Sequence, residues 1–261
     1  MPDSYHDIFD THAHYDDAKF DSDREQVVSS LATGGVVGVI NCATEPANFD
    51  SSRRLCAQYP FFYCAFGVHP EDIDAAGENW LDLTREAASY EKCVAIGEIG
   101  LDYHWRKDNS EAQKEVFARQ LELARELDLP VIIHDREAHA DVLELCRKYR
   151  PKGVLHSFSG SAELAEEYLA MGMYIGVGGS LTYQYAKKQP KVAAVTPMSR
   201  VLLETDAPYS SPEPHRGERN TSLFIPAVAQ RIGEIKGLDA QSVISQAHKN
   251  ALELFGIRPG D

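Results

Sequence analysis

Residues 7–14 read Asp-Ile-Phe-Asp-Thr-His-Ala-His, a short strand-like run that leads directly into two histidines, His12 and His14. In an extended backbone, side chains at positions i and i+2 lie on the same face, so both imidazoles can point at one ion. A strand that ends in such a pair suggests a catalytic metal site at the mouth of a barrel. One His-x-His pair is common by chance, and it gains weight only when later strands also end in metal ligands.

Seven further short apolar runs follow this first one, and helical periodicity fills the gaps between them. The predicted strands span residues 8–10, 36–41, 62–67, 94–98, 131–134, 154–156, 174–176 and 201–204. The clearest predicted helices span residues 111–127, 136–149 and 162–171. A Pro-rich stretch at 207–216 is predicted to be a long loop after the last strand, followed by two more helices up to residue 255.

Eight such alternations in 261 residues predict an α/β fold, the (β/α)8 TIM barrel, which typically needs ~250 residues. A doubly wound open sheet is the alternative. We favour the barrel because chemically capable residues follow several strands across the whole chain, and barrel active sites gather at the carboxyl ends of the strands. The sequence contains no internal repeat or convincing domain boundary. We therefore expect residues 1–261 to form a single domain.

Composition narrows the class of protein. The chain is 43% hydrophobic, which is enough for a sizeable core, and no apolar run approaches the ~20 residues of a membrane helix. Its start lacks the features of a signal peptide, and its five cysteines form no Cys-x-x-Cys pair, so we expect a reduced, cytoplasmic protein. The net charge of −14 argues against binding nucleic acid on a broad basic surface. Bound cations can still invert the field locally.

The predicted strand ends carry a set of metal-binding side chains: His12, His14, Glu98, His134, His156 and Asp206. A catalytic zinc uses three protein ligands and a water, so six residues suit two ions that share a ligand. Glu98 has two oxygens and is the natural shared ligand. His12, His14 and Asp206 then complete one site, and His134 and His156 the other. Ordinary buried hydrogen bonds would explain any one of these histidines, but they explain the whole set poorly.

Five sequence blocks resemble the signature blocks of the TatD family of metal-dependent DNases, within the amidohydrolase-like superfamily. They are Asp-Thr-His-Ala-His (10–14), Gly-Glu-Ile-Gly-Leu-Asp-Tyr (97–103), Val-Ile-Ile-His (131–134), Leu-His-Ser-Phe-Ser-Gly (155–160) and Glu-Thr-Asp-Ala-Pro-Tyr (204–209). The blocks occur in the family's order and cover nearly the whole chain. The resemblance implies a dinuclear divalent-metal centre in an amidohydrolase-like barrel and hydrolysis of phosphodiester bonds in DNA, in some members as a 3′→5′ exonuclease.

The resemblance also concerns individual residues. The six ligands match the family's metal positions one by one. Ser157 stands where many members carry cysteine, which keeps a small side chain. A related branch of amidohydrolases bridges its metals with a carbamylated lysine, but no lysine ends the fourth strand here, and Glu98 fills that role.

Asp206 and Glu98 are the predicted catalytic carboxylates. Glu98 bridges the ions, and Asp206, besides contacting one ion, can accept a proton from the attacking water. Asp10 lies two residues before His12 on the same strand face. It either orients an imidazole, as ligating histidines usually require, or packs inside the barrel.

Four residues near the same rim are predicted to bind the substrate. Arg136 follows His134 at i+2, and its planar guanidinium suits a phosphate oxygen, although a surface pair with Glu137 is the alternative. His69 follows the third strand, in a stretch that resembles a family block, and it can donate a hydrogen bond to the substrate. It is not needed as a ligand, because the other six residues already suffice for two ions.

The other two lie in loops. Tyr103, in the loop after Glu98, can stack on a base, an interaction worth ~1–3 kcal/mol. Arg216, together with Asn220, resembles a family Arg-Gly-x-Arg-Asn block that closes over the substrate. Three other histidines lack such a context and are interpreted as structural or surface residues: His6, His139 and His248.

The leading functional hypothesis is a metal-dependent deoxyribonuclease that uses a metal-activated water on single strands or strand ends. An acidic protein should not clamp long duplex strongly, which favours a narrow channel. The alternative is an amidohydrolase-type hydrolase of small esters, lactones or amides on the same scaffold. A third hypothesis, a metal-binding interaction protein without catalysis, is disfavoured by the bridging Glu98 and the candidate base Asp206.

The expected cofactors are two divalent cations per chain. Four histidine ligands favour zinc, manganese or iron over magnesium, which prefers oxygen ligands. Affinity order and cellular availability can override this preference, so zinc, manganese and magnesium all stay open. We expect DNA as substrate and no membrane partner, and the sequence does not specify an oligomeric state.

Overall fold

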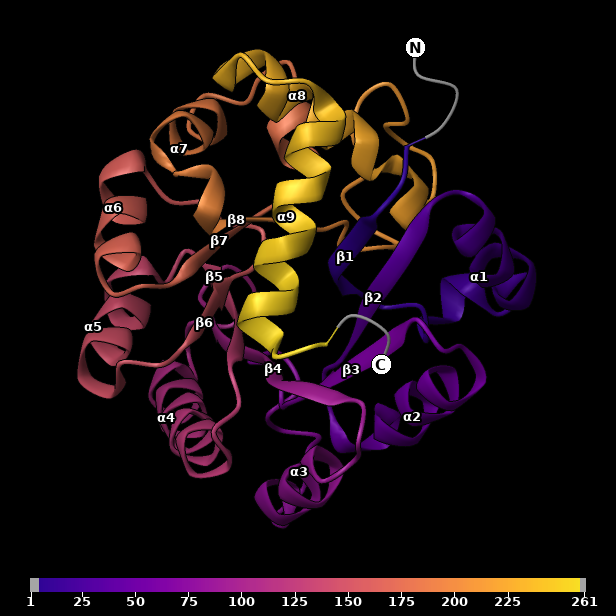
Figure 1. Cartoon of the computed structure of the whole chain (residues 1–261). Helices are drawn as coiled ribbons and strands as arrows, with labels where there is room; N and C mark the ends of the chain where they lie inside the picture. Colours follow the sequence, from indigo (N-terminus) through magenta and orange to yellow (C-terminus); the bar gives the residue numbers. More distant parts are fainter. Residues whose placement is uncertain (1–4, 259–261) are drawn as a thin grey trace.

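Eight parallel strands dominate the computed structural model, which describes residues 5–258. They are hydrogen-bonded in the order of the sequence, with β1 next to β2 and so on to β8. Their bounds are β1 Ile8–Ala13, β2 Val36–Ala43, β3 Phe62–Phe66, β4 Cys93–Asp102, β5 Val131–Arg136, β6 Gly153–Leu155, β7 Tyr174–Val177 and β8 Val201–Leu203. Figure 1 shows the strands gathered inside a ring of helices. The predicted (β/α)8 barrel is confirmed.

The helices follow the strands around the outside of the barrel (Figure 1). Their bounds are α1 Arg24–Thr33, α2 Phe49–Gln58, α3 Trp80–Ala88, α4 Ser110–Leu127, α5 His139–Tyr149, α6 Ala162–Ala170, α7 Gln189–Val195, α8 Ile225–Lys236 and α9 Ala240–Phe255. Short 3-10 turns lie at Ala18–Phe20, Pro46–Asn48, Gly179–Thr182, Met198–Arg200 and Ser222–Phe224. The predicted helix at 136–149 begins only at His139, because β5 continues to Arg136.

The barrel closes next to the two histidines of the first strand. The backbone N–H of Asp206 donates to the carbonyl of His12 at 2.9 Å, and that of His14 donates to the carbonyl of Ala207 at 2.7 Å. Ala13 and Ala207 form a parallel bridge between these two bonds. The closure therefore fixes His12, His14 and Asp206 against one another.

β4 is longer than the sequence predicted, so Glu98 lies within the strand and not at its end. The pairing with β5 continues past Glu98, with Gly100 opposite His134 and Asp102 opposite Arg136. Gly100 has a φ of 148°, and a Cβ there would lie 2.0 Å from the carbonyl oxygen of His134. Only glycine permits this close approach of the two backbones. It allows β4 and β5 to pair so that Glu98 and His134 lie near each other on adjacent strands.

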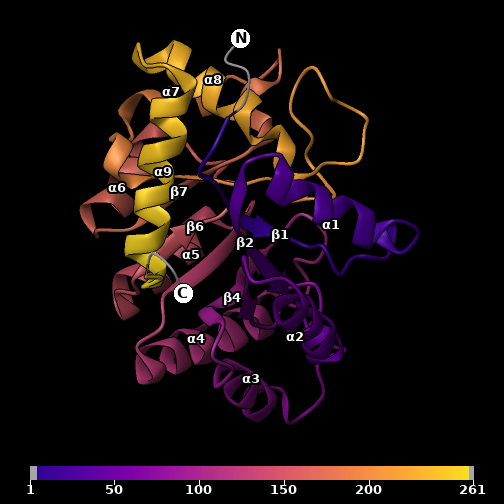
Figure 2. The same ribbon diagram turned by 45° about the vertical axis from the view of Figure 1, so that its right-hand side comes forward.

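Helix α9 covers the opposite mouth of the barrel. It crosses the front of the strands in Figure 1 and stays against them in the turned view of Figure 2. Its Ala251, Leu254 and Phe255 join a buried cluster with inward-facing strand residues such as Phe9 and Ile40. Apolar packing thus closes the amino-terminal mouth, and polar residues gather at the carboxyl-terminal one.

All five cysteines are buried and free. Within residues 5–258, the helices are too short or too polar for one of them to cross a membrane.

Candidate metal centre

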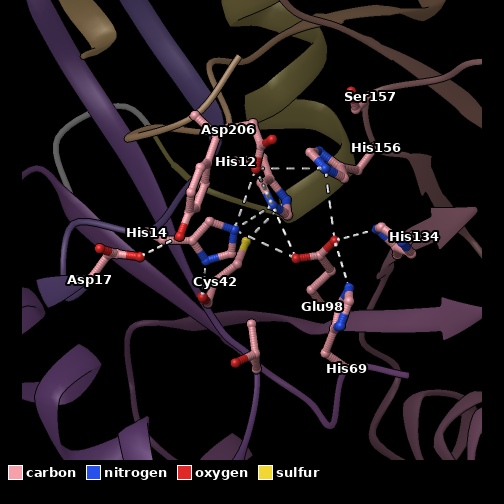
Figure 3. Close-up of polar contacts among 12 residues, drawn as sticks. His12, His14, Asp17, Cys42, His69, Glu98, His134, His156, Ser157 and Asp206 are labelled. Atoms are coloured by element: carbon pink, nitrogen blue, oxygen red, sulfur yellow. Dashed lines mark hydrogen bonds and ion pairs between the residues drawn. The ribbon is translucent and has the colours of Figure 1, made fainter. Parts of the chain in front are cut away.

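The structure brings all six predicted ligands together at the carboxyl-terminal mouth of the barrel (Figure 3). His12 belongs to β1, Glu98 to β4 and His134 to β5, while His14, His156 and Asp206 come just after β1, β6 and β8. All of them except His12 line a cavity of about 560 Å³. Ligand sites for small molecules usually span ~300–1,000 Å³.

Glu98 lies in the middle of this cluster, and its two oxygens face different histidines (Figure 3). Oε2 is 3.3 Å from Nε2 of His12 and 3.6 Å from Nε2 of His14. Oε1 is 3.0 Å from Nδ1 of His134 and 3.7 Å from Nε2 of His156. Asp206 Oδ1 lies 3.6 Å from Nε2 of His14 and 3.9 Å from Nε2 of both His12 and His156. This is the arrangement a bridging carboxylate requires.

The second ring nitrogens of His14 and His134 already have hydrogen-bond acceptors, and that of His156 lies at ion-pair distance from a carboxylate. Nδ1 of His14 lies 2.8 Å from the carbonyl oxygen of Cys42. Nε2 of His134 lies 2.9 Å from Asp102, and Nδ1 of His156 lies 3.1 Å from Glu204. Metal-ligating histidines almost always donate their other N–H in this way, which leaves the inward nitrogen free to bind an ion.

The inward-facing atoms fit divalent cations. Nε2 of His12 and Nε2 of His14 are 3.0 Å apart and point at the same carboxylate oxygen, so a shared cation suits both lone pairs. Ligand atoms that hold a zinc ion at about 2.0–2.2 Å lie roughly 3–4 Å from one another. The separations across the cluster fall in that range, which supports metal binding by this donor set.

His69 lies beside Glu98 in the same cluster, whereas the sequence analysis placed it at the rim as a residue that contacts the substrate. Its Nε2 lies 3.6 Å from Glu98 Oε1, and its ring meets that of His134 edge-on at 4.4 Å between centroids. Burial, together with the neighbouring His134, lowers the pKa of His69 to about 3, so the ring is neutral and can ligate a metal. The signal available in the sequence was its position after the third strand, at the same rim.

The charges of the cluster are complementary. Burial opposes ionisation of Glu98, but the contact with His12 and the neighbouring His156 hold the pKa of this carboxyl well below its usual value. Asp206 is likewise buried, and its contact with His14 lowers its pKa. Both carboxylates are therefore ionised and available as ligands at neutral pH.

Three residues that support the ligands were not predicted in these roles: Cys42, Asp102 and Glu204. Glu204 is buried and accepts a hydrogen bond from the backbone N–H of Ser157 in addition to its contact with His156. Cys42 Sγ lies 3.4 Å from Nδ1 of His12. A carboxylate next to a ligand at a buried strand end was the signal for Asp102 and Glu204.

Asp10 does not touch an imidazole nitrogen within the described part of the chain. Its carboxylate accepts hydrogen bonds from the hydroxyls of Thr205 and Ser222, each at 2.6 Å, and from the backbone N–H of Thr205 at 3.0 Å. It thereby ties β1 to the segment that follows β8 and carries Asp206.

Arg136 reaches the cavity wall, as predicted for a residue that binds substrate. It is the one Arg or Lys among the cavity-lining residues of the described chain. Glu137, its alternative partner, pairs with His104 at 2.8 Å. Within residues 5–258, Arg136 makes no ion pair, so its guanidinium is available to an anion.

Tyr103 and Arg216 lie off this wall. The Tyr103 hydroxyl donates to Asp141 at 2.6 Å, and the cavity residue of that loop is Trp105. Arg216 lies 4.0 Å from the ring centre of Tyr183 and donates to the hydroxyl of Tyr185 at 2.6 Å. The loop after β8 is instead fixed by Asn220, a buried residue that donates to the carbonyls of Thr205 and Tyr209.

The three histidines interpreted as structural or surface residues have partners elsewhere. His139 pairs with Asp135 at 2.9 Å, His248 stacks on Phe9, and His6 contacts Asp7. These contacts agree with a structural or surface role.

The chain resembles known proteins over almost its whole length. The model of a family described as TatD related DNase matches residues 9–256. The metal-dependent hydrolase YabD of Bacillus subtilis (strain 168), named as uncharacterized, is 38% identical over 253 residues, 96% of this chain and 99% of its own length. The 3′-5′ ssDNA/RNA exonuclease TatD of Dickeya dadantii (strain 3937) is 33% identical and covers 97% of this chain and 98% of its own length.

The solved structures agree with the sequence relatives. The crystal structure of YjjV, a TatD homolog from Escherichia coli K12, superposes with a TM-score of 0.91 at 34% identity. The match covers 97% of this chain and 99% of that one.

Proposed function

The chain belongs to the family of TatD-related DNases, and we propose that this hydrolytic enzyme cleaves phosphodiester bonds in single-stranded DNA, acting from a 3′ end. One observation carries the proposal. Glu98 stands between two sets of imidazole ligands, in a cavity whose wall also presents Arg136, which makes no ion pair with the described residues. A carboxylate-bridged pair of cations next to an arginine suits an anionic phosphoryl group better than a neutral carbonyl.

We assign two divalent cations to this centre, from among zinc, manganese and magnesium. His12, His14 and Asp206 would hold one, His134, His156 and His69 the other, and Glu98 both. Bound there, the cations supply Lewis acidity and lower the pKa of a coordinated water.

The chain's own residues then deprotonate the attacking water and orient the substrate and the metal ligands. Asp206 is ionised, faces the cavity and accepts the proton of the attacking water. Arg136 donates to phosphate oxygens and positions the strand. Asp102 and Glu204 keep His134 and His156 in the orientation that points one nitrogen at Glu98.

The charge of the cavity supports a strand end as substrate. Six carboxylates line it, from Asp16, Asp17, Glu71, Asp72, Glu98 and Asp206, against the single guanidinium of Arg136. A long duplex would bring many phosphates close to these carboxylates, and the cavity lacks enough cations to offset the repulsion. A single phosphodiester at a strand end needs its charge balanced at only one place, the metal centre with Arg136. In addition, the five buried, free cysteines support our assignment to a reducing compartment, the cytoplasm.

A side-by-side assay tests the proposal. Protein loaded in turn with zinc, manganese or magnesium is given single-stranded DNA labelled at either end, the matching duplex, RNA, and a panel of lactones and esters. We expect stepwise release of mononucleotides from the 3′ end of single strands and little cleavage of duplex. Lactone or ester turnover without DNA cleavage would overturn the nuclease assignment and favour the small-molecule alternative.

A further inference from the structure

Trp105 is a large aromatic side chain that stands exposed on the wall of the catalytic cavity. Trp105 is 61% exposed to solvent, whereas Trp80, the other tryptophan of the chain, is only 8% exposed. A single exposed apolar residue needs no explanation by itself. Trp105 differs because it shares the cavity wall with Arg136 and with the candidate metal ligands Glu98 and His134.

The Trp105 ring lies next to Arg136, the one Arg or Lys among the described residues that line the cavity. The guanidinium carbon of Arg136 lies over the indole, 5.4 Å from its centre. His104 meets the ring edge-on at 4.7 Å between centroids. Even with both neighbours in place, most of the indole remains accessible, so it offers an aromatic face and a cation side by side.

The loop that carries Trp105 is fixed to the metal centre through one carboxylate. Asp102 Oδ1 accepts the backbone N–H groups of His104 and Trp105 at 2.9 and 3.0 Å. Asp102 Oδ2 contacts Nε2 of His134 at 2.9 Å. Gln113 adds support, because its side chain accepts from the N–H of Asp102 and donates to the carbonyl of Arg106. The position of the indole is therefore set relative to the candidate metal ligands.

We infer that Trp105 and Arg136 form a subsite for one unpaired nucleotide, with its base stacked on the indole and its phosphate bound by the guanidinium. The inference rests on the proposed nuclease function and specifies the substrate: the nucleotide next to the bond that is cleaved. A nucleotide offers a flat base and an anionic phosphate close together, which matches the paired aromatic face and cation. Stacking requires a base free of its complementary strand, so this subsite selects single strands. It makes no use of the 2′-hydroxyl, so DNA and RNA are both accepted at this position.

A cycle of two proteins and two substrates tests the ring–base contact. The substrates are a short single strand and the same strand with an abasic site at the nucleotide next to the cleaved bond. The proteins are the wild type and Trp105→Leu, loaded with the same metal. We expect the substitution to lower kcat/KM on the intact strand by ~5–150-fold, mainly through KM, which is the range of one base–aromatic stack. On the abasic strand the two proteins should be nearly equal.

Matched controls separate stacking from general damage. Trp105→Phe keeps an aromatic face and should retain most of the activity. Tyr149→Leu removes another aromatic with a cation over its ring, Lys148 at 4.9 Å, from the end of α5 farthest from the cavity. It should leave both substrates unaffected, and thermal melting checks that each variant folds. Equal losses for Trp105→Leu on intact and abasic strands would overturn the subsite.

A binding measurement keeps the inference separate from the nuclease proposal. Trp80→Phe leaves Trp105 as the single tryptophan, and its fluorescence is followed in metal-loaded protein during titration with deoxyadenosine 5′-monophosphate or with deoxyribose 5-phosphate. Quenching by the nucleotide alone supports the subsite even if no strand is cleaved, in which case only the nuclease function fails. Strand cleavage without quenching and without base dependence rejects the subsite and leaves the nuclease function standing.

Discussion

At the scale of single residues, Glu98 has the role with the clearest consequence. Both of its oxygens face ligand nitrogens, so its loss removes an anionic ligand from each proposed ion. We expect Glu98→Ala to abolish activity and to reduce the metal content below two ions per chain, measured by elemental analysis of the purified protein. Glu126→Ala, which removes a surface carboxylate paired with Arg85, should change neither. A Glu98→Ala protein that holds two ions tightly would show that Glu98 is not the bridge.

Asp206 combines two roles that one substitution can separate. Asp206→Asn keeps the shape and one coordinating oxygen but removes the charge and most of the basicity. We expect kcat to fall by ~10²–10⁴-fold, as for the loss of a general base, while metal occupancy falls only partly. The acid limb of the wild-type pH–rate profile should be absent from the variant. Near-normal turnover by a fully metal-loaded variant would leave Asp206 as a ligand without a role as base.

At the scale of secondary-structure elements, an ion pair that is sensitive to pH joins the end of β5 to the first residue of α5. His139 contacts the buried Asp135 at 2.9 Å, and this contact raises the pKa of His139 above its usual value. The folded protein therefore binds the proton more tightly than the unfolded chain does. The stabilisation is complete below the unfolded pKa of about 6.5 and is lost as the pH rises through the higher folded pKa.

The His139→Gln variant tests this linkage. Urea unfolding should show a larger loss of stability relative to the wild type at pH 6 than at pH 9, because the wild type keeps the charged pair only at the lower pH. An equal loss at both values would mean that His139 contributes by packing and neutral hydrogen bonding.

The strands were predictable because short apolar runs and i, i+2 spacing are local features of the sequence. The ends of some strands were not predictable. The spacing of His12 and His14 alone predicts that both side chains point to one side at the end of β1. The extent of β4 escaped prediction because Gly100, just after the predicted end of the strand, looks like a strand breaker, although it permits the close approach to β5. The start of α5 was missed for a related reason, since β5 continues through Arg136.

The supporting contacts of the site were beyond the reach of sequence patterns. Glu204 meets His156 across 48 positions of the chain, and Cys42 meets His12 across 30. Which side chains meet depends on the register of neighbouring strands and on the closure of the barrel, and periodicity within one strand does not encode either. The same reason explains why His69 was expected to contact substrate and is found beside Glu98.

At the scale of the whole molecule, charge and metal binding are coupled. The chain carries a net charge of −14, and six of its carboxylates line one cavity. The cluster also gathers imidazole nitrogens around a single buried glutamate. Without cations, the clustered carboxylates repel one another, and the inward nitrogens lack the ligand that their geometry suits. Binding of cations to the folded state relieves both effects, so metal should stabilise the fold as well as activate the enzyme.

Thermal unfolding measures this coupling directly. A ligand that binds only the folded state at 100 times its Kd adds about 2.7 kcal/mol, which corresponds to a rise in Tm of about 5–10 °C for a chain of this size. We therefore expect chelator-treated protein to melt lower by about this amount than protein saturated with a divalent cation that supports activity. Glu98→Ala should show a smaller rise, because both sites lose a ligand. The same Tm with chelator and with saturating cation would contradict tight metal binding by this cluster, whatever the assays of activity had shown.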